Sequence, residues 1–251
     1  MEADLEQIAT WVRAADQIVV LTGAGISTES GIPDFRGPQG LWTKNPEAEK
    51  MATLSYYVGD AEVRKRSWRN RIESPMFQAD PNAGHVALAE LERKARLHTL
   101  VTQNVDGLHQ AAGTTPESVI EIHGNVHSAK CLSCGWRGTM DEVLDRVRAG
   151  EDDPVCLGCG GILKSATISF GENLVPEDLN RAQRAAAGAD LFLAIGTSLT
   201  VYPAAALPEI TLSAGGRLVV MNAEPTPFDE VAAAVVREQL GEVLPQLVSR
   251  V

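Results

Sequence analysis

A glycine-rich segment near the N-terminus has the composition of a phosphate-binding turn. The residues Gly23-Ala24-Gly25-Ile26-Ser27-Thr28 directly follow an apolar run that predicts a buried strand. Two residues without side chains let the backbone approach a pyrophosphate at the start of a helix. A tight turn with no ligand is the alternative. Thr28 replaces the third glycine of the dehydrogenase fingerprint and no acidic residue follows a second strand, so hydride transfer is disfavoured.

The segment after this turn combines an acidic, an aromatic and a basic residue. Asp34, Phe35 and Arg36 lie between Pro33 and Gly37. A short loop of this composition could fold over a bound cofactor and exclude water from it.

Four cysteines form two C-x-x-C pairs, with 21 residues between the pairs. Each pair can turn two thiolates toward one point, and two pairs complete a tetrahedral zinc site of Cys131, Cys134, Cys156 and Cys159. Because sulfur fills all four positions, no place remains for water or substrate, and the zinc is expected to be structural. A redox C-x-x-C or disulfides are the alternatives.

His123 follows the apolar run from Val119 to Ile122 and precedes Gly124. A lone histidine in such a place can simply be structural. Its side chain titrates near neutral pH, however, so it is also the natural residue to take a proton from a hydroxyl group.

Polar residues also follow the apolar run that ends at Val101. Gln103, Asn104 and Asp106 come next and lead into a predicted helix. Helix capping by Asn104 or Asp106 is one interpretation and does not exclude a second role in binding.

Together these segments resemble the sirtuin (Sir2-like) family of NAD-dependent protein-lysine deacylases, in its bacterial form. The matching segments are GAGIS, GIPDFRG, TQNVD, His123-Gly124 and Gly196-Thr197-Ser198, in the family's order and at similar spacing. The resemblance implies that NAD is consumed as a cosubstrate, that each chain holds one structural zinc, and that acyl-lysine proteins or peptides are the substrates. The implied products are nicotinamide, free lysine and O-acyl-ADP-ribose.

The resemblance also implies roles for individual residues. His123 would be the general base that deprotonates the ribose, and Asn104 would assist at the nicotinamide ribose. NAD contacts are expected from Gly23, Ala24, Gly25, Ser27, Thr28, Asp34, Phe35, Arg36, Gln103, Asn104, Asp106, Gly196, Thr197, Ser198, Asn222, Ala223, Glu224 and Leu240. In that set Asp106 would bind the carboxamide, and Leu240 would lie beside the adenine.

The segment from Ile168 to Glu172 resembles the family's substrate strand, although an ordinary alternating strand is the alternative. An extended peptide would add its backbone there and pair on its other side near Val201. Substrate contacts are expected from Ile168, Phe170, Gly171, Glu172, Val201, Trp68 and Arg71.

The acyl preference depends on Trp68 and Arg71, the nearest match to a Tyr-x-x-Arg pair that binds acidic acyl chains in some sirtuins. Trp68 lacks the phenol oxygen, so we expect acetyl or another uncharged acyl group. Arg71 as a solvated surface charge is the alternative.

Two other functions fit the same motifs. One is a protein ADP-ribosyltransferase on the same scaffold, and the other is a non-catalytic module that binds NAD or zinc. An intact His123 and Asn104 argue against the second.

The elements that must position these residues alternate along the chain. Apolar runs predict strands at residues 18–21, 97–101, 191–195 and 218–221, and helical patterns occupy 5–15, 83–96 and 179–187. Alternating strands and helices predict an α/β fold, a Rossmann-like doubly wound parallel sheet whose strand ends form the ligand crevice. We expect residues 1–36, 82–127 and 164–251 to form this NAD-binding domain. Residues 37–81 would be a helical or loop insert of the small domain, and 128–163 a small zinc-binding module.

The overall composition narrows the partners and the compartment. A formal net charge of −11 in 251 residues argues against direct nucleic-acid binding and could attract basic substrate segments, although acidity for solubility alone is the alternative. No apolar run approaches the ~20 residues of a membrane span. With two C-x-x-C pairs, these features predict a cytoplasmic protein that does not bind membranes.

Overall fold

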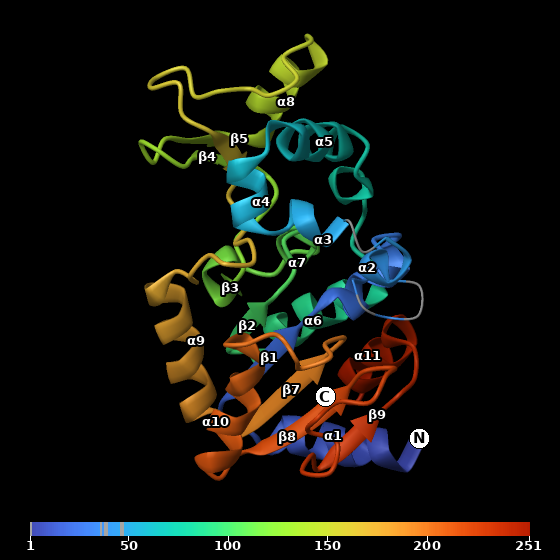
Figure 1. Cartoon of the computed structure of the whole chain (residues 1–251). Coiled ribbons are helices and arrows are strands. Elements are labelled where there is room, and N and C mark those ends of the chain that lie inside the picture. The colour runs from blue at the N-terminus through green and yellow to red at the C-terminus, as the bar shows by residue number, and fades with distance from the viewer. Residues whose placement is uncertain (1, 36, 38–39, 46–47) are drawn as a thin grey trace.

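Two sheets of different size organise the chain in the computed structural model, which describes residues 2–35, 37, 40–45 and 48–251 (Figure 1). The larger sheet is entirely parallel and has six strands. In spatial order its strands are β3 Val119–Glu121, β2 Thr99–Thr102, β1 Ile18–Thr22, β7 Leu191–Ile195, β8 Arg217–Met221 and β9 Ala234–Val236. The four predicted strands are present, and the three-residue strands β3 and β9 were not predicted.

The strand order reverses at β1, which lies between β2 and β7. Thr22 at the end of β1 pairs with Thr102 of β2 and with Ile195 of β7. The three strands therefore end at the same level, and the loops that follow them start side by side. Such a switch point is where open α/β sheets bind ligands.

Side chains of the central strands alternate between two apolar layers. Ile18 and Val20 of β1 pack in one cluster, whereas Val19 and Leu21 pack in the other. This alternation follows from the pleat, which points successive side chains to opposite faces. The sheet is buried on both faces, as its near-continuous apolar strands predict.

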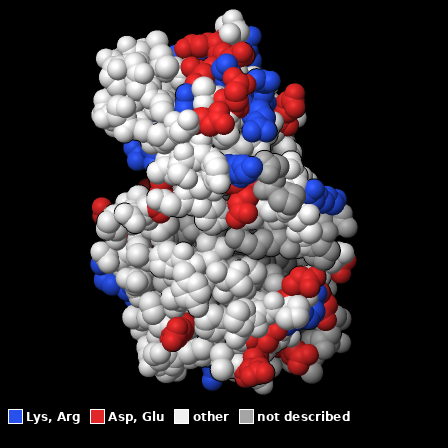
Figure 2. All heavy atoms as spheres, viewed as in Figure 1, with Lys and Arg blue, Asp and Glu red and all other residues white. Residues whose placement is uncertain are grey.

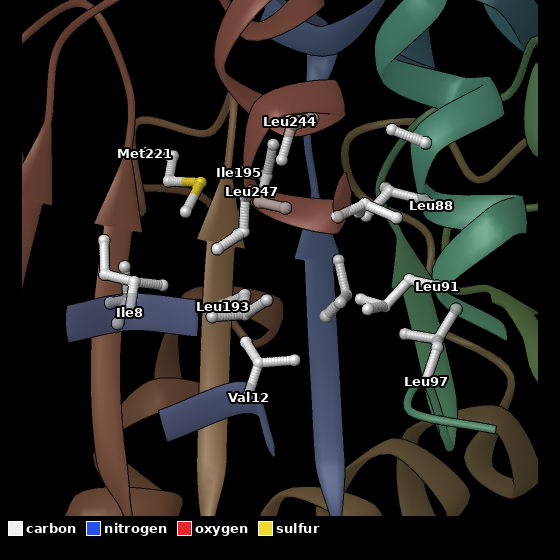
Figure 3. Packing of buried hydrophobic residues seen from close by; sticks show 14 of the residues in the cluster. Ile8, Val12, Leu88, Leu91, Leu97, Leu193, Ile195, Met221, Leu244 and Leu247 are labelled. Atoms are coloured by element: carbon white, nitrogen blue, oxygen red, sulfur yellow. The ribbon is translucent and has the colours of Figure 1, made fainter. Parts of the chain in front are cut away.

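Helices cover both layers. The first layer lies under α1 Glu2–Ala14, α6 Ala83–Arg93 and α11 Leu240–Ser249, and Figure 3 shows their leucine, isoleucine and valine side chains meeting those of β7 and β8. The second layer lies under α9 Pro176–Gly188 and α10 Leu207–Ser213. Among the described helices, none combines the length and the apolar character that a membrane crossing needs.

The smaller sheet is antiparallel and has the order β5-β4-β6. Its strands are β4 Ser128–Cys131, β5 Arg137–Thr139 and β6 Leu163–Ser165, and α8 Met140–Arg148 follows β5. A capping box between Thr139 and Glu142 fixes the start of α8. We call residues 128–165 the cysteine module.

The insert that precedes α6 is helical. It contains α2 Leu41–Lys44, α3 Ala48–Met51, α4 Leu54–Gly59 and α5 Ala61–Ile72. Three of these helices are six residues or shorter, too short to give a clear periodic pattern. The part-buried ion pair between Arg64 of α5 and Asp153, at 2.9 Å, joins the insert to the cysteine module.

Short turns of helix complete the chain. They are η1 Ala24–Ser30, η2 Pro75–Phe77, α7 Leu108–Ala111, η3 Pro116–Ser118 and η4 Ala204–Ala206. Figure 2 shows that Lys and Arg side chains gather beside Asp and Glu at the end of the molecule where Figure 1 places α8 and α5. The central part of the same face carries few charges.

Candidate active site

A cleft of about 880 Å³ lies where the loops after β1, β2, β7 and β8 meet the insert and the segment that follows β6. Most of the residues that the sequence singled out line it. They are Gly23, Ala24, Gly25, Ser27, Asp34, Phe35, Arg71, Gln103, Asn104, Asp106, His123, Ile168, Phe170, Gly171, Glu172, Gly196, Thr197, Ser198, Val201, Asn222 and Glu224. The fold therefore brings together residues from Gly23 to Glu224, which are far apart in the chain.

Five of the predicted NAD and substrate contacts are not among the described lining residues: Thr28, Arg36, Trp68, Ala223 and Leu240. Arg36 lies outside the described part of the chain. Thr28 donates a hydrogen bond to the Gly25 carbonyl, and Ala223 does not line the cleft. Leu240 packs in the first apolar layer, at the start of α11.

The structure corrects the prediction for Trp68. Its side chain is fully buried in an apolar cluster with Met140, Val143 and Leu144 of the cysteine module. The indole therefore does not reach the cleft, whereas Arg71, three residues later on α5, does.

Three glycines bring two strand ends into backbone contact. Gly25 N donates to the Gly196 carbonyl oxygen at 2.8 Å, and a Cβ added to Gly25 would lie 2.8 Å from the Gly196 Cα atom. Gly196 itself has φ +61, and a Cβ there would lie 2.5 Å from Ile26 N. Side chains are thus excluded from this floor of the cleft, which leaves bare backbone that a pyrophosphate can approach.

Hydrogen bonds hold Asn104, Ser27 and Asp106 beside these glycines. Asn104 Nδ2 donates to the Gly23 carbonyl and to Ser27 Oγ, each at 3.1 Å, and Ser27 Oγ donates to Asp106 Oδ2 at 2.8 Å. A carbonyl oxygen only accepts, so the Asn104 amide has a single sensible orientation. Both of its hydrogens are used within the protein, and Oδ1 is the atom left to accept from a ligand.

Asp106 has two roles. Its Oδ2 atom receives the Ser27 hydroxyl, and its Oδ1 atom accepts from Leu108 N at 3.0 Å, at the start of α7. The N-cap of α7 is Gly107 and no side chain caps this helix, so the capping alternative is wrong for both residues: Asp106 accepts from Leu108 N from the position before the cap, and the Asn104 side chain points to Gly23 and Ser27.

Two buried histidines lie behind this polar set. His85 Nε2 is 3.4 Å from Ser27 Oγ, and the rings of His85 and His109 are 5.0 Å apart. Burial lowers the pKa of His85 to about 4 and that of His109 to about 3, so both rings are neutral at pH 7. Neither is among the residues that line the cleft, so their role is structural.

His123 is held in a single tautomer. Its Nδ1 atom lies 3.0 Å from the Gln103 carbonyl oxygen, which can only accept, so Nδ1 carries the hydrogen. Nε2 is then the basic nitrogen. Burial lowers the pKa of His123 below its ordinary value, although the hydrogen bond to Gln103 partly offsets this effect. The ring is therefore a neutral base at physiological pH.

Three aromatic side chains form part of the cleft wall. The Trp42 ring lies 4.6 Å from that of Phe35 and 5.4 Å from that of Phe170. Trp42 also lines the cleft, and sequence reasoning did not select it, whereas Tyr202, another lining residue, lies next to the predicted contact Val201. The high aromatic content of the insert was the only signal that could have indicated Trp42.

The segment at residues 168–170 is extended and paired on one side. Phe170 N donates to the Ala52 carbonyl at 2.8 Å, and Leu54 N donates to the Phe170 carbonyl at 2.9 Å. Ile168 N donates to the His123 carbonyl at 2.7 Å, which ties this segment to the loop that follows β3. Phe170 is thus fixed in the wall of the cleft by the backbone of the insert.

The four cysteines of the cysteine module converge. Their sulfur atoms all lie within 4.8 Å of one another, with Cys131 to Cys159 at 3.5 Å and Cys134 to Cys156 at 3.7 Å. Zn–S bonds of about 2.3 Å in a tetrahedron place sulfur atoms about 3.8 Å apart. A disulfide would need about 2.05 Å, so the thiols are free and fit a zinc ion.

Comparison with known proteins decides the family. A family model described as "Sir2 family" matches residues 23–203. The chain belongs to the Sir2 family. The predicted family and fold class are confirmed, and the matched residues run from the first glycine of the turn to the segment that contains Tyr202.

Relatives of the Sir2 family cover nearly the whole chain. "NAD-dependent protein deacetylase 2" of Streptomyces coelicolor is 53% identical over 92% of this chain and 95% of its own length. "NAD-dependent protein deacetylase" of Sulfolobus acidocaldarius is 44% identical over 99% of this chain and 95% of its own length.

Solved Sir2 structures share the fold. A complex described as "Sir2-p53 peptide-NAD+" is 36% identical, with a TM-score of 0.88, and covers 98% of this chain and 97% of its own. A "Structure of Sir2Tm bound to a propionylated peptide" is 35% identical with a TM-score of 0.87 and the same coverage. The architecture around the cleft is thus that of Sir2 proteins crystallised with NAD or an acylated peptide.

Proposed function

We propose that this chain is an NAD-dependent protein-lysine deacetylase, which removes acetyl or other acyl groups and releases nicotinamide and O-acyl-ADP-ribose. The observation that carries the proposal is the neutral His123, whose Nδ1 hydrogen is committed to Gln103 and whose Nε2 atom is a free base in a cleft of suitable size. Relatives with the name of this activity cover more than nine-tenths of the chain.

The residues present fit NAD as the consumed cosubstrate. When bound, NAD supplies an electrophilic sugar carbon with nicotinamide as its leaving group. The bare backbone at Gly23, Gly25 and Gly196 would receive the pyrophosphate, and Asn222 and Glu224 the adenosine half. Asn104 Oδ1 would accept from a ribose hydroxyl, because its amide hydrogens are already used.

The protein's own contribution to the reaction is positional and basic. His123 Nε2 would take a proton from a ribose hydroxyl and so allow that oxygen to attack the acyl carbon. Phe35, Trp42 and Phe170 would exclude water from the acyl-lysine. Zinc would hold the cysteine module together at Cys131 and its three partners, remote from this proton transfer.

The division of labour follows the two sheets. The predicted boundary at residue 164 would move to 166, because β6 is the third strand of the small sheet. Residues 1–36, 82–127 and 166–251 would then bind NAD, and residues 37–81 would form the small domain with the zinc module. Acyl-lysine segments of proteins would be the partners, bound along residues 168–172 and near Val201. Four free thiols suit a reducing compartment, the cytoplasm.

Arg71 favours a second class of substrate, lysines that carry an acidic acyl chain. Its guanidinium lines the cleft and donates to Ser67 and Ser165, and no carboxylate of the described residues forms an ion pair with it. A partly buried arginine that forms no ion pair with the described residues favours an anionic partner. An acyl chain that ends in a carboxylate, such as succinyl, would supply one.

The test combines the protein with NAD and a peptide series that differs only in the acyl group on lysine: acetyl, propionyl and succinyl. We expect stoichiometric release of nicotinamide and loss of the acyl mass from the acetylated peptide. Transfer of label from NAD to protein with the acyl group intact would identify an ADP-ribosyltransferase. Binding of NAD without nicotinamide release would identify a non-catalytic module.

The same series tests Arg71. Arg71→Met should lower turnover of the succinylated peptide more than that of the acetylated one. Equal losses on both peptides would show that Arg71 serves only the fold, and the first function would then stand alone.

A further inference from the structure

Two lysines face each other across the cysteine module. Lys130 of β4 and Lys164 of β6 are direct cross-strand partners in the antiparallel pairing. Like charges directly opposite one another destabilise a sheet, and Lys164 is only 2% exposed, so water cannot screen the pair effectively. This arrangement requires an anion between the two ammonium groups.

Glu172 supplies that anion from outside the sheet. Its Oε1 atom lies 2.8 Å from Lys130 Nζ, and its Oε2 atom lies 2.8 Å from Lys164 Nζ. The Oε2 atom also accepts from Ser169 N at 2.8 Å. Burial opposes the charge on Glu172, but these donors together outweigh it and lower the pKa of Glu172 to about 2. Both carboxylate oxygens are occupied within the protein.

The ionic contact closes the turn that carries Phe170. Glu172 N donates back to the Ser169 carbonyl at 2.9 Å, and Gly171 adopts φ +86, a conformation that glycine permits. Phe170 lies inside this turn and lines the cleft. The turn is thus held at one end by the backbone of Ala52 and at the other by the two lysines.

We propose that Glu172 is a positioning residue through which the Lys130–Lys164 pair of the cysteine module sets the place of Phe170, and with it the affinity for the acyl-lysine peptide. Glu172 was predicted as a direct substrate contact. Because its oxygens are already bound, it acts through the wall that it holds. The effect on KM rests on the proposed deacylase function, whereas the effect on peptide binding rests only on the geometry of the turn.

The kinetic test is Glu172→Gln, which keeps the shape of the side chain and removes its charge. The two lysines then face each other without a counterion, so the turn shifts. We expect the KM for an acetylated peptide to rise about tenfold or more, with kcat and the KM for NAD within about twofold of wild type. Glu177→Gln, a neutralised glutamate five residues away that does not line the cleft, should change none of the three.

A second substitution separates positioning from general loss of structure. Adding Lys130→Met to Glu172→Gln removes the surplus cation, and we expect it to restore at least part of the peptide KM. A lower kcat at unchanged peptide KM, or no recovery in the double variant, would overturn the proposal.

The effect on peptide affinity can be measured without turnover. Titration of a fluorescent acetylated peptide into His123→Ala and into His123→Ala/Glu172→Gln should show weaker binding in the second variant, at equal zinc content and melting temperature. Equal affinities would contradict the positioning role even if the enzyme proved to have another activity. An inactive wild type with a clear difference in peptide affinity would refute only the deacylase function. Should Glu172→Gln melt early, Glu172→Asp keeps the charge but shortens the reach, and it should weaken peptide binding in the same direction.

Discussion

The two sheets of this chain are stabilised by different means. The six-stranded sheet is buried between two extensive apolar layers, whereas the cysteine module contributes eight buried residues, two of them cysteines, to a single cluster that Trp68 of α5 completes. Three strands and one helix provide too little apolar surface to fold alone, so a metal and ion pairs must supply the difference. The side of the cleft that would bind NAD is therefore self-supporting, and the side that would bind the acyl-lysine depends on metal and charge.

The largest effect that would test this contrast is loss of the metal. Cys131→Ser should abolish zinc binding and unfold the cysteine module, because a structural zinc contributes about 10 kcal/mol or more in small zinc domains. Metal analysis should give one zinc per wild-type chain and none in the variant. Proteolysis should then cut within residues 128–165 before the large sheet. Unchanged metal content, or simultaneous loss of both regions, would refute the contrast.

Next in size is the loss of the base. His123→Ala should lower kcat by about 10²- to 10⁴-fold while the melting temperature stays near that of wild type, since proton transfer is lost and no core contact is. His98→Ala, an exposed histidine outside the cleft, is the matched control. A variant with wild-type turnover would remove His123 from the mechanism. Activity of the wild type should fall in acid as His123 becomes protonated, at a pH below about 6.5 because burial lowers its pKa.

The large sheet should show its own pH dependence of stability through His85 and His109. Their pKa values are about 4 and about 3 in the fold and about 6.5 in the unfolded chain. Above pH 6.5 neither state binds these protons, so the stability that depends on neutral rings is complete. Below it the unfolded chain takes up both protons first, and the free energy of unfolding should fall by at most about 2.7 kcal/mol per pH unit down to about pH 4.

Urea titrations between pH 7 and pH 4.5 would measure this slope. The loss should be smaller in His109→Gln, which cannot be protonated. A slope that is the same in wild type and variant would show that His109 does not contribute.

The smallest expected effect concerns the large sheet and its affinity for NAD. Gly25→Ala places a methyl group against the Gly196 backbone, and overpacking of this kind typically costs about 1–3 kcal/mol. NAD affinity, measured by calorimetry, should fall while zinc content and peptide affinity stay unchanged. Gly31→Ala is the control, because a Cβ there meets nothing within 4 Å, although its φ of +83 adds some strain. Equal NAD affinity in Gly25→Ala and wild type would mean that the glycine floor is not a binding surface.

Much of the large sheet could be predicted because its central strands are continuous apolar runs that end at polar residues. The strands β3 and β9 could not, since three residues give no period, and the short helices of the insert were missed for the same reason. The cysteines were predicted from spacing that is local in sequence, and the structure brings their sulfur atoms together.

The parts of the candidate site that could not be predicted from the sequence depend on contacts between residues far apart in the chain. Trp68 and Arg71 do lie together, with the Arg71 guanidinium carbon 5.2 Å from the centre of the Trp68 ring, but Trp68 is buried in the apolar cluster and only Arg71 lines the cleft. Likewise, nothing local in sequence shows that Lys130 and Lys164 are opposite each other, because that follows from the pairing of β4 with β6. Register and helix orientation are set by tertiary packing, which a single sequence does not show.

The hydrogen bonds that run from Asn104 through Ser27 to Asp106 all point the same way. The Ser27 hydroxyl has one hydrogen, which it donates to the Asp106 carboxylate while its oxygen accepts from the Asn104 amide. Rotating this hydrogen toward another acceptor would break the hydrogen bond to Asp106. Asn104→Asp would put an acceptor opposite the Gly23 carbonyl and opposite a serine that already gives its hydrogen away. Each of these hydrogen bonds therefore has a fixed donor and acceptor. Asn104→Asp, although nearly identical in shape, would destabilise the site more than its size suggests.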